Sequence, residues 1–66
     1  MKTKFPNIKV KLTGTDGNAF ALIGKVAGAL RKAKVPAADV TEFTRDAMSG
    51  NYDHVLATCR AWVEVR

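Results

Sequence analysis

Three adjacent residues near the C-terminal end carry side chains suited to acid–base or metal chemistry: Tyr52, Asp53 and His54. Nucleophilic catalysis needs a nucleophile, a base and an orienting group within mutual reach, and a metal site needs several converging ligands. Helical spacing places His54 opposite the apolar face that holds Cys59. We therefore predict no catalytic residue, no metal site and no cofactor, and we interpret Asp53 as a helix cap or first-turn acid.

A turn-forming segment resembles an anion-binding loop in its position. Residues 14–18 read Gly-Thr-Asp-Gly-Asn and precede a predicted helix, whose free N-terminal amides attract anions. The spacing matches neither the P-loop nor the dinucleotide-binding glycine pattern, and Asp16 would repel a phosphate. We interpret the segment as a turn with a helix cap at Asp16 or Asn18. The candidate contacts of this loop with a ligand or partner are Thr15, Asp16, Gly17 and Asn18.

Positive charge is concentrated in the first half of the chain. Residues 1–34 contain eight basic residues and one acidic residue, a net charge of +7, whereas residues 35–66 contain three basic and five acidic residues, a net charge of −2. Such polarisation favours an anionic partner for the first half: nucleic acid, acidic protein or membrane surface. A solvated face that keeps the protein soluble is the alternative. The candidate partner- or anion-binding residues are Lys9, Lys11, Lys25, Arg31, Lys32 and Lys34.

These residues must be positioned by a strand and three helices. Residues 8–12 alternate apolar and basic side chains, which is typical of a half-buried strand with Lys9 and Lys11 facing outward. Helices are predicted over 18–32, over 36–48 and from a cap at Asn51 or Asp53, and Gly50 is the predicted left-handed residue after the second helix. Residues 63–66 either extend the third helix or form a second strand.

A lone strand leaves its backbone groups unpaired, and the C-terminal segment is the remaining β-prone stretch. We therefore predict an α+β fold with the order β-α-α-α-β, in which three helices pack on a short two-stranded ribbon. The chain forms a single domain over residues 1–66, and residues 1–6 are expected to be a loose basic arm.

Apolar periodicity predicts the inward faces of the helices. We interpret Cys59 as a small core residue and Trp62 as the residue that closes the core, with an exposed partner anchor as the alternative. The helical residues expected on the inward faces are Phe20, Leu22, Ile23, Val26, Ala27, Leu30, Ala33, Val40, Phe43, Ala47, Tyr52, Val55, Leu56, Cys59, Trp62 and Val63.

A strip of very small residues, Ala21, Gly24 and Gly28, lies between the apolar face of the first predicted helix and its lysines. Glycine inside a helix costs about 1 kcal/mol relative to alanine. The strip therefore indicates close packing against another helix or the ribbon, and a homodimer or partner seam is the alternative.

Composition excludes several classes of protein. A single cysteine forbids an internal disulfide. No stretch approaches the roughly 20 apolar residues that span a bilayer, and the N-terminus does not read as a signal peptide. We expect a reducing, cytoplasmic setting.

Three segments carry a resemblance to a known group of proteins: KVKLTGTDGNAF at 9–20, SGNYDH at 49–54 and WVEV at 62–65. Together they resemble small bacterial proteins, including proteins of mobile elements, for which no activity is established. The resemblance covers residues 8–65 and implies a complete protein rather than a fragment, but it implies no function.

The absence of a catalytic pattern, the polarised charge and the small-residue strip predict a protein-binding module, an adaptor or inhibitor that docks on a larger partner. Nucleic-acid binding through the basic face of the strand and first helix is the alternative. Membrane binding is not expected, because a domain this small needs the apolar face of its first helix for its own core.

Overall fold

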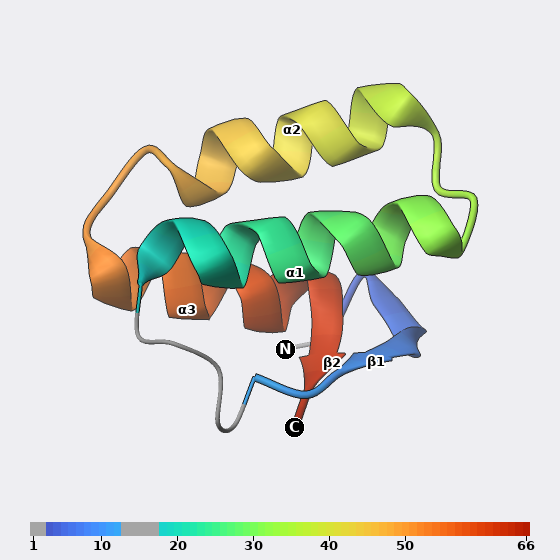
Figure 1. The fold of residues 1–66 in the computed structure, drawn as a ribbon, viewed down its shortest axis with the longest axis horizontal. Coiled ribbons are helices and arrows are strands. Elements are labelled where there is room, and N and C mark those ends of the chain that lie inside the picture. Colours follow the sequence, from blue (N-terminus) through green and yellow to red (C-terminus); the bar gives the residue numbers. More distant parts are fainter. Residues whose placement is uncertain (1–2, 13–17) are drawn as a thin grey trace.

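The computed structural model describes residues 3–12 and 18–66. A strand, three helices and a second strand follow one another along the chain, which confirms the predicted α+β fold (Figure 1). The elements are β1 (Phe5–Val10), α1 (Ala19–Lys32), α2 (Ala37–Ala47), α3 (Tyr52–Trp62) and β2 (Val63–Val65).

The two strands pair in parallel, so the C-terminal residues leave α3 as a strand rather than extending it. Lys9 lies opposite Glu64 and Val10 opposite Val65. Beyond the strand ends, the Arg66 amide donates to the Val10 carbonyl over 2.8 Å. The segment 8–12 has the predicted alternation, since Val10 is buried and Lys9 is exposed.

Residues 3–6 are not the loose arm that the sequence predicted, because β1 begins at Phe5 and the residues before it are hydrogen-bonded to the end of α3. The Lys4 amide donates to the Ala61 carbonyl over 2.8 Å. The Thr3 hydroxyl donates to the Arg60 carbonyl over 3.0 Å. The last carbonyls of a helix have no partner within the helix, so this segment satisfies groups that α3 leaves unpaired.

The same segment covers Trp62, which is 6% exposed. The Phe5 ring centroid lies 5.9 Å from that of Trp62, and Lys4 Nζ lies 4.2 Å from the Trp62 ring centroid. From the other side Phe43 packs edge-on, with the ring centroids 5.6 Å apart. Trp62 therefore closes the core as predicted, and its apolar surface is the physical reason that residues 3–6 are held in place.

The helices form two layers over the strands. α1 and α3 contact the strands, and α2 packs on α1 and α3 (Figure 1). The predicted inward face of α2 is confirmed, as is the burial of Cys59. Three residues predicted to face inward are exposed instead: Phe20 and Ala33 of α1, and Tyr52 of α3. All three lie at helix ends, where the neighbouring elements do not reach over them.

Side chains and turns define the ends of the helices. Asn18 caps α1 by accepting from the Phe20 amide over 2.8 Å, and Asn51 caps α3 by accepting from the His54 amide over 3.0 Å. α1 ends in a Schellman motif, in which Lys34 has a φ of 65°. The left-handed residue predicted at Gly50 thus occurs instead at Lys34, in the turn between α1 and α2.

Within the described parts of the chain, no helix combines the length and the apolar character needed to cross a membrane.

Candidate functional site

Large apolar side chains are exposed at one end of the helical bundle. Among the described residues they are Phe20, which is 68% exposed, Met48 at 53% and Tyr52 at 43%. Phe20 lies in the first turn of α1, Met48 directly after α2, and Tyr52 at the start of α3. These three helix ends meet at the left of Figure 1, so the exposed side chains share one end of the molecule.

A depression of about 120 Å³, the apolar hollow, lies between these helix ends. Phe20 and Met48 stand at its rim, and buried Ile23 and Val55 belong to its lining. The residues that line it are Ala19, Phe20, Ile23, Ala47, Met48, Gly50 and Val55. A hollow of this volume with apolar walls accepts part of one apolar side chain.

The sequence does not predict the apolar hollow, because its apolar periodicity places Phe20 on the buried face of the first helix. At about 100° per residue, Phe20 lies roughly 80° from Leu30, at the edge of the apolar face rather than at its centre. Its place in the first helical turn was the available signal, since a residue there is covered only if another element extends past the helix end.

A second cluster joins the end of α2 to α3 through the His54 ring. His54 Nε2 lies 2.8 Å from the Asp46 carbonyl oxygen and 3.2 Å from Ser49 Oγ. The same nitrogen lies 3.4 Å from Thr58 Oγ1 and 3.5 Å from Asp46 Oδ1. The chain thus brings a serine, a histidine and an aspartate together, a combination that the sequence did not predict.

The geometry of this cluster does not match a catalytic triad. In a triad the acid orients one ring nitrogen while the other nitrogen accepts the proton of the nucleophile. Here Ser49 and Asp46 both approach Nε2, and the Ser49 hydroxyl donates to the Asp46 carbonyl over 2.7 Å. The cluster instead ties down the last turn of α2, where free carbonyls and a negative dipole end favour a donor such as His54.

Gly50 keeps this turn compact. A Cβ added at Gly50 would lie 2.7 Å from both Cβ and Cγ of His54, closer than two carbon atoms can approach. The glycine therefore makes room for the imidazole ring rather than supplying a left-handed conformation.

The six candidate basic residues, Lys9, Lys11, Lys25, Arg31, Lys32 and Lys34, are all exposed. Around α1 they do not lie on one side, because six residues of helix rotate Arg31 by about 120° away from Lys25. Lys9 faces Glu64 across the strands, and Glu64 lies 3.4 Å from the Arg66 guanidinium. The outer face of the strands thus carries charges of both signs.

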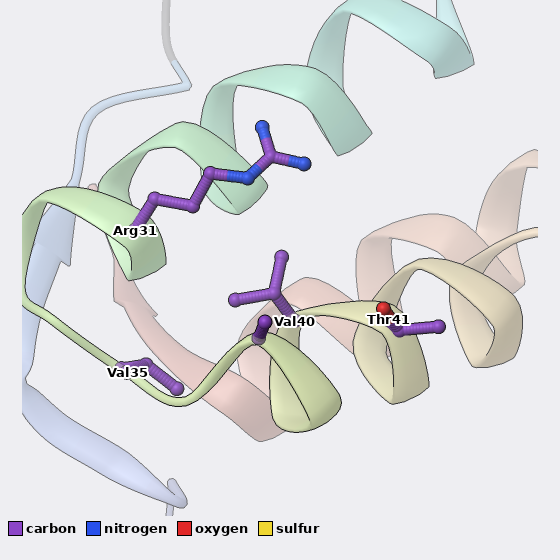
Figure 2. A pocket seen from close by; sticks show the side chains of 5 residues that line it. Arg31, Val35, Val40 and Thr41 are labelled. Carbon is purple, nitrogen blue, oxygen red and sulfur yellow. The ribbon is translucent and has the colours of Figure 1, made fainter.

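Arg31 extends over a groove between α1 and α2, which we call the Arg31 groove (Figure 2). Its volume is about 260 Å³. Val40 of α2 points toward the Arg31 side chain from the other wall, and Thr41 lies beside Val40 on the same helix. The residues that line the groove are Arg31, Val35, Ala37, Val40 and Thr41.

The small-residue strip does not pack closely inside the protein, as the sequence indicated. Ala21, Gly24 and Gly28 are exposed, and a Cβ added at either glycine would meet nothing within 4 Å. The reason is that Ala21 and Gly28 lie opposite the buried face of α1, and Gly24 lies beyond the edge of that face. The alternative, a homodimer or partner seam, stays a prediction.

The predicted loop contacts divide between two parts of the chain. Thr15, Asp16 and Gly17 lie outside the described residues. Asn18 belongs to the described part, where its side chain is the N-cap of α1.

Cys59 is buried, and burial raises the pKa of its thiol above the usual value. A thiol with a raised pKa is a poor nucleophile at neutral pH, so Cys59 belongs to the core. Over residues 3–12 and 18–66, no group of three or more His, Cys, Asp or Glu side chains is arranged to hold a metal ion.

No protein-family model, curated protein or solved structure matches this chain. The functional conclusion therefore depends on the side chains at the surface and on their geometry.

Proposed function

We propose that this chain is a small non-enzymatic protein-interaction module, an adaptor or inhibitor that docks on a larger partner. The observation that supports this most directly is the apolar hollow with Phe20 and Met48 exposed at its rim. A domain of 66 residues has little apolar surface to spare for anything but its core. Aromatic residues and methionine are enriched at protein interfaces, and their grouping at one end of the bundle favours a docking role.

The size of the two depressions supports a macromolecular partner rather than a small molecule. The apolar hollow and the Arg31 groove measure about 120 Å³ and 260 Å³. Small-molecule sites usually enclose about 300–1,000 Å³. Shallow depressions of this size suit single side chains projecting from a partner surface.

Site-specific photo-crosslinking tests this function. A photo-reactive phenylalanine analogue at position 20 is expected to cross-link one defined protein in cells, whereas the same analogue at position 57, an exposed site on α3, is expected not to. The captured protein, purified and titrated against the chain, should bind the Phe20→Ser variant at least about tenfold more weakly, a loss of about 1.4 kcal/mol. Equal cross-linking from both positions, or equal affinity of the variant, would contradict the proposal.

Nucleic-acid binding is the second candidate, and the six exposed basic side chains support it. The acidic Glu64 opposite Lys9 counts against it. Phosphate contacts make affinity fall steeply with salt, so binding of labelled duplex and single strands is measured over a salt series. The matched variant has Lys9, Lys11, Lys25 and Lys32 changed to glutamine. Micromolar binding near physiological salt that is lost in this variant would place this candidate first.

A further inference from the structure

The apolar hollow and the Arg31 groove lie along the same side of the α1–α2 pair. On α1, Phe20 and Arg31 are eleven residues apart, which is about three helical turns. The two side chains therefore leave the helix within roughly 20° of the same direction and lie on the same edge of α1. On α2, Ala37 and Met48 have the same separation and share an edge in the same way. The two helices run antiparallel side by side (Figure 1), so each depression is bounded by one residue of each pair.

Small residues of both helices lie between the two depressions. Gly24 lies on this edge of α1, with nothing within 4 Å of a Cβ added there. Thr44 lies on the facing edge of α2, and its hydroxyl already donates to the Val40 carbonyl over 2.9 Å. We call the hollow, the Arg31 groove and this surface between them the interhelical groove, which is about 16 Å long at 1.5 Å of rise per residue.

The two ends of the interhelical groove differ in chemistry. One end offers the apolar walls of Phe20 and Met48. At the other, the ion pairs between described residues join His54 to Asp46 and Arg66 to Glu64 and do not include Arg31. Lys34, in the turn after α1, adds exposed positive charge at this end, so this end is complementary to a carboxylate.

A helix fits this groove better than an extended segment. A bound strand needs backbone donors and acceptors along its length, whereas the backbone groups within a helix are paired internally. A groove between two helices instead accepts the side-chain ridges of a third. The missing side chain at Gly24 allows the backbone of that helix to approach closely.

We infer that the interhelical groove binds an acidic amphipathic helix of a partner protein. A large apolar side chain of that helix enters the apolar hollow, and a carboxylate about three turns away pairs with Arg31. This inference rests on the proposed function and adds to it the chemistry of the partner segment.

Peptide display tests the inference with a library of randomised helix-forming peptides of about five turns, selected on the immobilised full chain near physiological salt. The enriched peptides are expected to combine a large apolar residue with Asp or Glu ten to twelve residues away. Synthetic copies should be helical when bound. Phe20→Ser and Arg31→Glu should each weaken their binding at least about tenfold.

A charge swap makes the test specific to Arg31. A peptide whose acidic residue is changed to lysine should bind the Arg31→Glu protein more tightly than it binds wild type. The matched control is Lys9→Glu, the same change of sign on the strands, which should alter binding by less than about twofold. Phe20, Arg31 and Lys9 are all exposed and lie outside the core, and circular dichroism checks that each variant folds.

Failure of the inference is separable from failure of the proposed function. Three results would overturn the inference that the partner segment is an acidic helix. They are selected peptides without acidic residues, equal losses of affinity from Arg31→Glu and Lys9→Glu, and no enrichment of any peptide. The position-20 cross-link would still support a docking module in that case. Sedimentation that reveals a dimer dissociated by Phe20→Ser would also overturn the inference, because a second copy would then occupy the groove.

Discussion

The two ends of the helical bundle differ in how far their aromatic side chains are exposed to solvent. At the strand end, Trp62 is 6% exposed and lies beneath Lys4 and Phe5. At the other end, Phe20 is 68% exposed beside Met48. Both aromatics occur near a helix end within an apolar stripe. The difference is that residues 3–6 cross the end of α3, which makes one aromatic part of the core and leaves the other available to a partner.

The largest expected effect separates these two aromatics. Trp62→Ala should destabilise the fold by about 3–5 kcal/mol, because it removes a buried ring that Phe5 and Phe43 contact. Phe20→Ala should change the free energy of unfolding by no more than about 0.5 kcal/mol, as expected for an exposed position. Urea unfolding followed by circular dichroism measures both. Similar losses from the two substitutions would mean that Phe20 belongs to the core.

The two turns between helices differ as well, and Gly50 tests the turn between α2 and α3. Gly50→Ala should destabilise the protein by about 1–3 kcal/mol, since the new Cβ would overlap the His54 side chain and force it to move. Gly24→Ala is the matched control and should stabilise the protein by about 1 kcal/mol, because alanine favours the helix and meets open space there. Thermal unfolding of both variants should therefore shift in opposite directions, and shifts of the same sign would contradict the packing at Gly50.

Lys34 tests the turn between α1 and α2. Its φ of 65° is a left-handed conformation that costs a non-glycine residue about 1–2 kcal/mol. Lys34→Gly should relieve this cost and raise the stability by up to about 1 kcal/mol, with part of the gain offset by the larger freedom of glycine in the unfolded chain. Lys32→Gly, in the last turn of α1, should be destabilising instead. A loss of stability in Lys34→Gly would show that the lysine side chain contributes more than its backbone costs.

The smallest expected effect concerns the core that joins the two ends. Burial raises the pKa of the Cys59 thiol, so the folded chain keeps the proton at a pH where the unfolded chain has lost it. Stability should therefore be unaffected below the pKa of the unfolded thiol and should fall as the pH rises above it, by no more than about 1.4 kcal/mol per pH unit. Comparing urea unfolding of wild type and Cys59→Ala between pH 7 and 10 isolates this dependence. Parallel pH profiles would contradict the burial of the thiol.

Local sequence signals predicted most of the fold. The alternation at 8–12 and the apolar periodicity of α2 and α3 placed those elements and, apart from exposed Tyr52, their inward faces, because the side-chain period follows from the backbone geometry of each element. The need to pair a lone strand predicted β2. The positive charge of the first half was also readable, although its distribution over different sides of α1 and the acidic neighbour of Lys9 were not.

The candidate site was less predictable, because it depends on which elements end beside one another. The amino-acid sequence by itself determined the order β-α-α-α-β and the burial of Cys59 and Trp62, and it narrowed the cap of α3 to Asn51 or Asp53. Only the tertiary structure decided that Phe20 is exposed, that residues 3–6 cover Trp62 and that His54 meets Asp46 and Ser49. The physical reason is that periodicity reports which way a side chain points, whereas exposure at a helix end depends on whether a distant segment extends past it.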